Sequence, residues 1–302
     1  MSDFLFVGGA ADPEMAAIRD LVLAHGYRWA QATAGGKPVH PGNAYKADGA
    51  DPVLSGLDAT LVLVECGFTP EFRAAAPSWF AHEIVVDHHR PGDPGYGAAP
   101  ENFASASSIG QALHLLKRSP AGRTLRFVAA ADHCLEAAYR GKCPGVDPDE
   151  LMAWRASSRA AFQKRPVSDV LADVEAARKR LRDAVFFGRC SACGTEDIRC
   201  HFGASWCPYC NGSEPDSEIS PVQAEYADLR GENIPELPEA AAREGVAFLS
   251  QVKDRDGREK VVLMAAPPNL VERFLAGKIV AGLTDMYGDP ARGFAGGYLA
   301  AK

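Results

Sequence analysis

The chain lacks any long apolar run. No stretch approaches the roughly 18 consecutive apolar residues that a membrane-spanning helix requires. The first residues also lack a basic segment followed by an apolar core, the pattern of a secretory signal. We therefore expect no membrane span and a cytoplasmic location.

An excess of positive charge is lacking as well. Lysine and arginine together number 32 against 39 aspartates and glutamates, and the formal net charge is −7. A broad duplex-binding surface needs a basic face, so we expect no extended duplex DNA surface. The charge is still compatible with a small anionic substrate held by a metal ion and a few arginines. Internal repeats and low-complexity tracts are absent from the sequence.

What the sequence does contain is an alternation of apolar strands and helical segments in its first part. Helical spacing marks Pro13–His25, and a serine-capped helix is expected over Ser107–Leu116. Strand-like runs are expected at Phe4–Val7, Tyr27–Ala32, Ala59–Val64, Glu83–Val86 and Arg126–Ala131. Strands that alternate with helices predict an α/β fold, a parallel sheet with flanking helices.

The second part has a different pattern. Residues 148–183 are alanine-rich and helical in character, and a polar linker is expected over 211–220. Two strand-like runs, Val246–Val252 and Lys260–Met264, flank Asp256-Gly257 and predict a hairpin. A helix over Asn269–Leu275 and a glycine-rich tail follow. At 302 residues we expect three parts: a domain over 1–185, an insert over 186–215 and a smaller α/β domain over 216–302.

The most informative motif is Asp87-His88-His89, directly after the run Glu83–Val86. A strand tip is where an open α/β sheet places its chemistry. One carboxylate and two imidazoles in a row rarely serve packing, because each needs a hydrogen bond or a ligand when it is buried.

Other acidic residues also follow predicted strands, namely Asp12 and Glu14, Glu65, and Asp132. Each alone has an ordinary explanation, such as acids in the first turn of a helix. Together at one sheet edge they would repel one another unless a divalent cation neutralised them. Oxygen-rich ligands with some imidazole favour Mn²⁺ or Mg²⁺ over zinc, and a pair of such ions is a known device for phosphoester hydrolysis.

In this order the motifs resemble those of the DHH phosphoesterase superfamily, which includes RecJ-type exonucleases, oligoribonucleases and family II inorganic pyrophosphatases. Asp87-His88-His89 matches the motif that names the family. The stretch Gly8–Glu14 aligns with its first motif, Glu65 and Asp132 with its second and fourth, and Ser105–Gln111 with its small-residue helix start. The resemblance covers about residues 1–185.

The resemblance implies a role for each matched residue. Glu65 would bridge two metal ions, and Asp12 would bind one of them. The ligands of the other ion would be Glu14, His88 and Asp132. Asp87 would orient the neighbouring imidazole, and His89 would face the scissile phosphate.

The sequence departs from the family pattern at three positions. Gly8 stands where the family has a metal-ligating histidine, and Glu14 and Glu65 are one methylene longer than the family's aspartates. Three outcomes stay open: a single-metal site, recruitment of His133 or His40 as a substitute ligand, or loss of catalysis.

The cysteines gather in one region. Five of the eight lie between residues 190 and 210, and two Cys-x-x-Cys pairs are separated by 13 residues: Cys190, Cys193, Cys207 and Cys210. This spacing is typical of a structural, four-thiolate Zn²⁺ site, in which Cys200 or His201 can replace a ligand. The rival interpretation is redox, because Trp206–Cys210 is similar to a glutaredoxin active site. The polar residues after Cys210 are poor helix starters, and this favours zinc.

The C-terminal tail Gly288–Tyr298 is similar in composition to the substrate-gripping loop of DHH proteins. Arg292, Gly296 and Gly297 are its candidate phosphate-binding residues. Association into a homodimer is left open.

The sequence thus predicts a metal-dependent phosphodiesterase that acts on a short oligonucleotide or a cyclic or linear dinucleotide. The alternative is a catalytically degenerate protein of the same fold that binds nucleotide or nucleic acid. A third, less favoured hypothesis is an adaptor that binds partners through its zinc knuckle.

Overall fold

The computed structural model describes residues 4–52, 60–119, 122–190, 219–253, 257–290 and 293–300. The chain divides into two compact units, Met1–Ser158 and Arg159–Lys302. This division precedes the expected boundary at residue 185 and places the second long helix with the C-terminal unit. None of the helices in the described part of the chain has the length and apolar composition needed to cross a membrane.

The first unit is built on a six-stranded sheet with the order β3-β2-β1-β5-β6, in which β4 also pairs with β2. The neighbours β2, β1, β5 and β6 are parallel, whereas β3 and β4 run antiparallel to β2. The strands are β1 (Phe4–Gly8), β2 (Arg28–Ala34), β3 (Lys37–Pro38), β4 (Gly49–Asp51), β5 (Thr60–Val64) and β6 (Glu83–Val86). The expected α/β fold with a parallel central sheet is confirmed for this unit.

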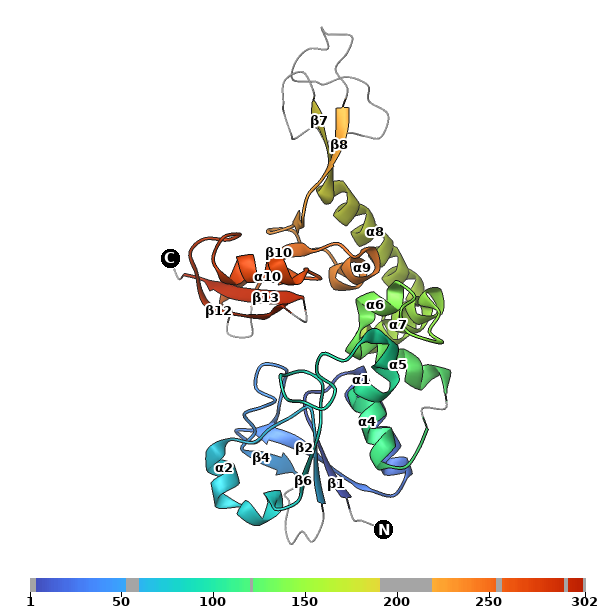
Figure 1. The fold of residues 1–302 in the computed structure, drawn as a ribbon, viewed down its shortest axis with the longest axis vertical. Coiled ribbons are helices and arrows are strands. Elements are labelled where there is room, and N and C mark those ends of the chain that lie inside the picture. Colours follow the sequence, from blue (N-terminus) through green and yellow to red (C-terminus); the bar gives the residue numbers. More distant parts are fainter. Residues whose placement is uncertain are drawn as a thin grey trace. The chain divides into compact units, whose positions relative to one another are not determined.

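Apolar side chains cover both faces of this sheet. On one face Leu5 and Val7 pack with Phe68 and with aromatic residues of α2 (Pro70–Ala75) and the 3₁₀ helix η1 (Pro77–Phe80). The other face carries α1 (Pro13–Ala24), whose Ile18 is fully buried. In Figure 1, α2 lies on one side of the sheet, and α1 and α4 lie on the other. Apolar residues on both faces explain why β1 and β5 are apolar throughout.

A helical layer completes the first unit. The helix α4 (Ser108–Leu115) begins at Ser107, whose hydroxyl accepts a hydrogen bond from Gly110 N, so the expected serine cap is confirmed. The other elements are η2 (Pro100–Asn102), α3 (Phe103–Ala106), α5 (Arg123–His133), α6 (Leu135–Tyr139) and the first part of α7 (Pro148–Gln163), which continues into the second unit.

One expectation for this layer is wrong. The run Arg126–Ala131, predicted as a strand, lies inside α5. Residues 127–130 are all buried, so the apolar pattern shows neither the alternation of a strand nor the spacing of a helix and cannot distinguish a strand from a helix. Three consecutive alanines then favour the helix, because alanine has the highest helix propensity.

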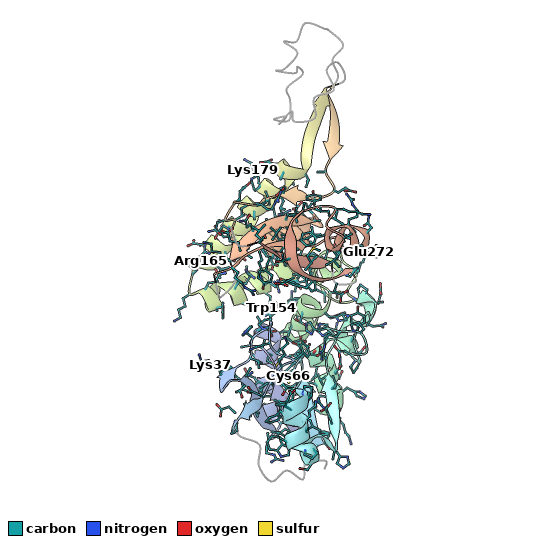
Figure 2. The ribbon with its side chains drawn as sticks, turned by 90° about the vertical axis from the view of Figure 1, so that its left-hand side faces the viewer. Lys37, Cys66, Trp154, Arg165, Lys179 and Glu272 are labelled. Carbon is teal, nitrogen blue, oxygen red and sulfur yellow. The ribbon has the colours of Figure 1, made fainter. Side chains whose placement is uncertain are left out.

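The second unit has a five-stranded sheet with the order β12-β13-β11-β10-β9, antiparallel except for the pair β9 and β10. Its strands are β9 (Ala227–Asp228), β10 (Phe248–Lys253), β11 (Glu259–Met264), β12 (Leu283–Asp289) and β13 (Phe294–Leu299). The helix α10 (Pro268–Leu275) buries Leu270, Val271 and Phe274 in the same apolar cluster as Leu249 and Leu263 of the sheet. A second cluster joins α8 (Val167–Val185) to α9 (Leu237–Glu244). Figure 2 labels Lys179 on α8 and Glu272 on α10. The predicted pairing of β10 with β11 is confirmed.

The glycine-rich tail forms strands rather than the expected loop. Gly296 and Gly297 lie in β13, opposite β12. A Cβ atom placed on Gly296 would lie 2.7 Å from Cζ of Tyr287, so glycine at this position makes room for an aromatic ring of the neighbouring strand. Arg292 lies outside the described residues.

A two-stranded ribbon, β7 (Phe186–Cys190) and β8 (Ile219–Gln223), follows α8 (Figure 1). The strands are antiparallel, and Cys190 pairs with Ile219. The described strand ends, Cys190 and Ile219, therefore lie side by side. Cys193, Cys207 and Cys210, together with the expected linker up to residue 218, lie outside the described residues, and the zinc site stays a prediction.

Candidate metal centre

Four metal-competent side chains of the first unit converge. Glu65, His88, His89 and Asp132 each offer one ligand atom, and these atoms all lie within 4.8 Å of one another. Glu65 directly follows β5, and the two histidines follow β6 by one residue. The parallel pairing of β5 with β6 brings these residues to one sheet edge, as predicted. Asp132 was expected at a strand tip, but it comes from the last turn of α5.

Glu65 has an unusual backbone. Its φ angle of 50° lies in the left-handed region, which non-glycine residues seldom adopt. The end of β1 approaches closely, because Gly9 N donates to Val64 O at 2.9 Å and a Cβ on Gly9 would lie 2.2 Å from Glu65 O. Backbone strain of this kind costs about 1–3 kcal/mol, and it is found preferentially at functional sites. The next residue, Cys66, which Figure 2 labels, is buried. Its thiol donates to Val7 O.

Asp87 is the hydrogen-bonding hub of the centre, and it is fully buried. Its Oδ1 accepts from the backbone N–H groups of His88 and His89 and from the His89 ring Nδ1, at 2.7, 3.0 and 2.9 Å. Its Oδ2 accepts from the Tyr45 hydroxyl at 2.8 Å. Burial alone would raise the pKa of Asp87, but the hydrogen bonds from His89 and Tyr45 outweigh it and lower that pKa. Asp87 is therefore an anion that orients the His89 ring.

The backbone of the motif is also clamped. Gln111 of α4 accepts from Asp87 N through Oε1 and donates to Asp87 O through Nε2, at 3.1 and 2.8 Å. Gly95 N donates to the same carbonyl at 3.0 Å. A Cβ on Gly95 would lie 2.0 Å from Ala106 O and 2.7 Å from His88 Cβ, so only glycine fits here.

His88 connects the helical layer to the cluster. Its Nδ1 lies 3.1 Å from the hydroxyl of Ser108, the first residue of α4, and its Nε2 lies 3.0 Å from Asp132 Oδ2. Glu65 Oε1 lies 3.8 Å from Nδ1 of both His88 and His89. Both His88 and Ser108 are buried, so these contacts fix the position of the ring.

The first-motif acids lie beside the four-residue group rather than within it. Glu14 is buried, its Oε1 accepts from Ile109 N at 2.9 Å, and burial and the neighbouring Asp132 raise its pKa. Asp12 is the N-cap of α1, and its Oδ1 accepts from Met15 N at 2.7 Å.

The electrostatics of the group favour a cation. Burial, followed by the Asp132 carboxylate, raises the pKa of Glu65 to about 8. Burial opposes ionisation of Asp132 too, but the neighbouring Glu14 and His88 side chains lower its pKa. Three buried carboxyl oxygens, Oε2 of Glu14, Oε1 of Glu65 and Oδ2 of Asp132, have no partner in hydrogen-bond geometry among the described residues, although Asp132 Oδ2 lies 3.0 Å from His88 Nε2. Unsatisfied buried oxygens beside two imidazoles are the donor set that a divalent ion satisfies, so these residues fit a metal.

The position of Gly8 is closed to a side chain. A Cβ on Gly8 would lie 2.1 and 2.5 Å from the Trp29 ring atoms Cζ2 and Cη2, and 3.0 Å from Met15 Sδ. The Trp29 indole therefore occupies the space in which a histidine at position 8 would begin. Neither proposed substitute belongs to the four-residue group. The His133 ring packs edge-on to His88 at 5.0 Å and has a buried Nδ1 without a hydrogen bond, whereas His40 Nδ1 accepts from Gly42 N.

Sequence reasoning missed Tyr45 as a supporting residue. No local signal marks it, because it lies 42 positions before Asp87 in the chain. The small-residue start of α4 was noted as a family feature, and this start supplies Ser108 and Gln111.

Comparison with known proteins adds no assignment: no protein-family model matches the chain, and a search of curated proteins finds no match.

Proposed function

We propose that this protein is a metal-dependent phosphodiesterase of the DHH type, and that it acts on a short oligonucleotide or a cyclic or linear dinucleotide. The observation that carries the proposal is the convergence of Glu65, His88, His89 and Asp132 within 4.8 Å, with carboxylate oxygens that lack hydrogen-bond partners. The sequence order of the motifs, on which the DHH resemblance depends, supports the same conclusion.

The residues divide into ligands and positioning groups. Glu65, His88 and Asp132 would hold Mn²⁺ or Mg²⁺, with Glu14 and Asp12 beside them as further carboxylates. A divalent cation at this position supplies Lewis acidity and offsets charge on a phosphoryl group. Asp87 holds Nδ1 of His89, so the Nε2 edge of that ring faces the other way. We propose that Nε2 of His89, when it carries a proton, donates a hydrogen bond to a phosphate oxygen.

The position of Arg90 favours an anionic substrate. It directly follows His89 and is exposed, and its guanidinium carbon lies 3.4 Å from the centroid of the Tyr45 ring. Stacking on an aromatic face holds a guanidinium in place at little entropic cost. A preorganised cation next to His89 suits a ligand with few phosphates, and the net charge of −7 agrees with this.

The test is hydrolysis in Mn²⁺ of a panel containing pApA, a short RNA, cyclic dinucleotides and pyrophosphate. We expect turnover of at least one dinucleotide or short RNA, and His88→Ala should abolish it. Asp87→Asn should reduce it about 10- to 100-fold, as is usual when the partner of a ligand or its neighbour is lost. His114→Ala, an exposed position on α4, is the matched control and should keep full activity. Turnover that survives His88→Ala would contradict the proposal.

A second candidate function rests on the closed position of Gly8. Loss of the family's histidine, with Trp29 in its space, favours a catalytically silent protein that kept the fold and binds nucleotide. Calorimetry separates the candidates. Binding of pApA without turnover of any substrate in Mn²⁺ supports the silent protein, whereas turnover supports the enzyme.

A further inference from the structure

A pair of cysteines in the first unit plays no part in the proposed chemistry. Cys134 Sγ lies 3.1 Å from Cys143 Sγ, and both are free thiols. Two sulfur atoms in a disulfide are about 2.05 Å apart, so closing the bond requires a movement of about 1 Å. Three of the described cysteines are free, and the third, Cys66, is hydrogen-bonded to Val7 O in the sheet.

The backbone holds both sulfurs in place. Cys134 ends α5, and its N–H donates to Ala130 O at 3.2 Å. The short helix α6 then ends in a Schellman turn, in which Gly141 has a φ of 70° and Lys142 N donates to Ala137 O at 2.9 Å. This turn reverses the chain and returns Cys143 to Cys134.

The loop after Cys143 is also fixed against α5. Gly145 has a φ of 73°, and a Cβ atom there would lie 2.4 Å from Nη1 of Arg126. The loop thus contacts the Arg126 side chain, which comes from the helix that ends at Cys134. The backbone turn at Gly141 lies between the two cysteines and brings them close together in space.

We infer that Cys134 and Cys143 are a redox modification site that forms a reversible disulfide by exchange with a low-molecular-weight disulfide. Cys134 is partly exposed, whereas Cys143 is 2% exposed, so the external disulfide reaches Cys134 first. The sulfur of Cys134 attacks it, forms a mixed disulfide and releases one small thiol. The sulfur of Cys143 then attacks Cys134 Sγ and expels the second small thiol. The two protein thiols are oxidised, and one external disulfide is reduced to two thiols.

The inference does not rest on the proposed phosphodiesterase activity, although the cysteine pair lies near one of the candidate metal ligands. Cys134 follows Asp132 by two residues, so the disulfide would tie the end of the helix that carries Asp132 to the loop at Cys143. Because the movement required is small, oxidation should leave the fold intact and raise the melting temperature by several degrees.

The experiment uses the full chain, oxidised glutathione as the probe, and alkylation followed by peptide mass mapping. In the wild type we expect a crosslink between the Cys134 and Cys143 peptides, loss of both alkylation labels and full recovery after dithiothreitol. Cys66 should stay reduced in the same sample and serves as the internal control. The cysteines at 190–210 fall in separate peptides, so their oxidation does not interfere with the assignment.

Two variants test the order of attack. Cys143→Ser should accumulate one glutathione on Cys134, because the resolving thiol is gone. Cys134→Ser should leave Cys143 reduced and without an adduct, because Cys143 is buried. Wild-type thiols that stay alkylatable after treatment, or that are protected under reducing conditions by a bound metal ion, would overturn the inference without reliance on either variant.

Discussion

At the scale of single residues, the centre depends on side chains that never touch a substrate. Tyr45 and Gln111 hold the carboxylate and the backbone of Asp87, and Asp87 in turn holds His89. A buried carboxylate that accepts four hydrogen bonds has a defined position. The His89 ring, which donates one of these bonds, is therefore held in a defined position too. The arrangement is costly to disturb, because each lost donor leaves a buried charge partly unsatisfied.

Tyr45→Phe removes one of these donors and no packing atoms of the ring. We expect the free energy of unfolding to fall by about 1.5–3 kcal/mol, the usual contribution of a hydrogen bond to a charged group. Urea denaturation measures the change. Tyr27→Phe is the control, because the Tyr27 ring packs on Phe4 and Phe6 and its hydroxyl has no role in the centre. Equal stability of the two variants would contradict the assigned role of Tyr45.

Gly95→Ala tests the close approach beside His88. The added Cβ would overlap Ala106 O and His88 Cβ, so we expect a loss of about 1–3 kcal/mol in stability, as is typical of overpacking. Mn²⁺ should also bind more weakly, because His88 is displaced. Gly67→Ala is the matched control, since a Cβ there would lie 3.6 Å from the nearest atom of Tyr45, an ordinary contact. Calorimetric titration of Mn²⁺ into both variants checks this expectation, and unchanged affinity in Gly95→Ala would count against it.

At the scale of elements, α1 and α4 are joined through Glu14. Its Oε1 accepts from Ile109 N in the first turn of α4, where backbone N–H groups lack partners within the helix. Glu14→Ala leaves this buried N–H unsatisfied, and we expect a loss of about 1–3 kcal/mol. Glu14→Gln keeps an acceptor oxygen and removes the ionisable group beside Asp132, so the metal-free protein should lose less stability than Glu14→Ala. Thermal unfolding in EDTA compares the two, and equal losses would show that the hydrogen bond is unimportant.

The elements that could be predicted from sequence are those with a clear local pattern. The strands β1, β2, β5 and β6 are short apolar runs bounded by turn residues, and α1 and α4 carry recognisable caps. The helix α5 was mistaken for a strand because its buried residues are consecutive, and β12 and β13 were hidden by glycines that only the neighbouring strand explains.

The residues of the candidate site likewise divide into those with a local sequence signal and those without one. Glu65 and His88 could be predicted together because the ends of their strands are visible in the sequence. Asp132 was included through motif order alone, because the strand expected before it is part of α5. The place of Trp29 against Gly8, the hydrogen bond of Tyr45 and the contact between Cys134 and Cys143 depend on long-range packing, which no local pattern encodes.

At the scale of the whole molecule, the four clustered cysteines predict one structural zinc ion. We expect about one zinc per purified chain, measured by plasma mass spectrometry, and its loss in a Cys193→Ser/Cys207→Ser double variant. Cys66→Ser, which alters a thiol in the sheet of the first unit, should keep the zinc. A zinc-free chain with a Cys207–Cys210 disulfide would instead support the redox interpretation of that motif.

The ribbon of β7 and β8 has a practical consequence. Because Cys190 and Ile219 are paired across the ribbon, the strand ends that flank residues 191–218, here called the cassette, are adjacent. Excising residues 191–218 and joining the strands by an Asn-Gly turn should leave both compact units folded, since two-residue turns of this type close antiparallel strands. The shortened protein would allow zinc-dependent behaviour to be separated from the chemistry at Asp87-His88-His89, and the excised cassette could be grafted onto another hairpin.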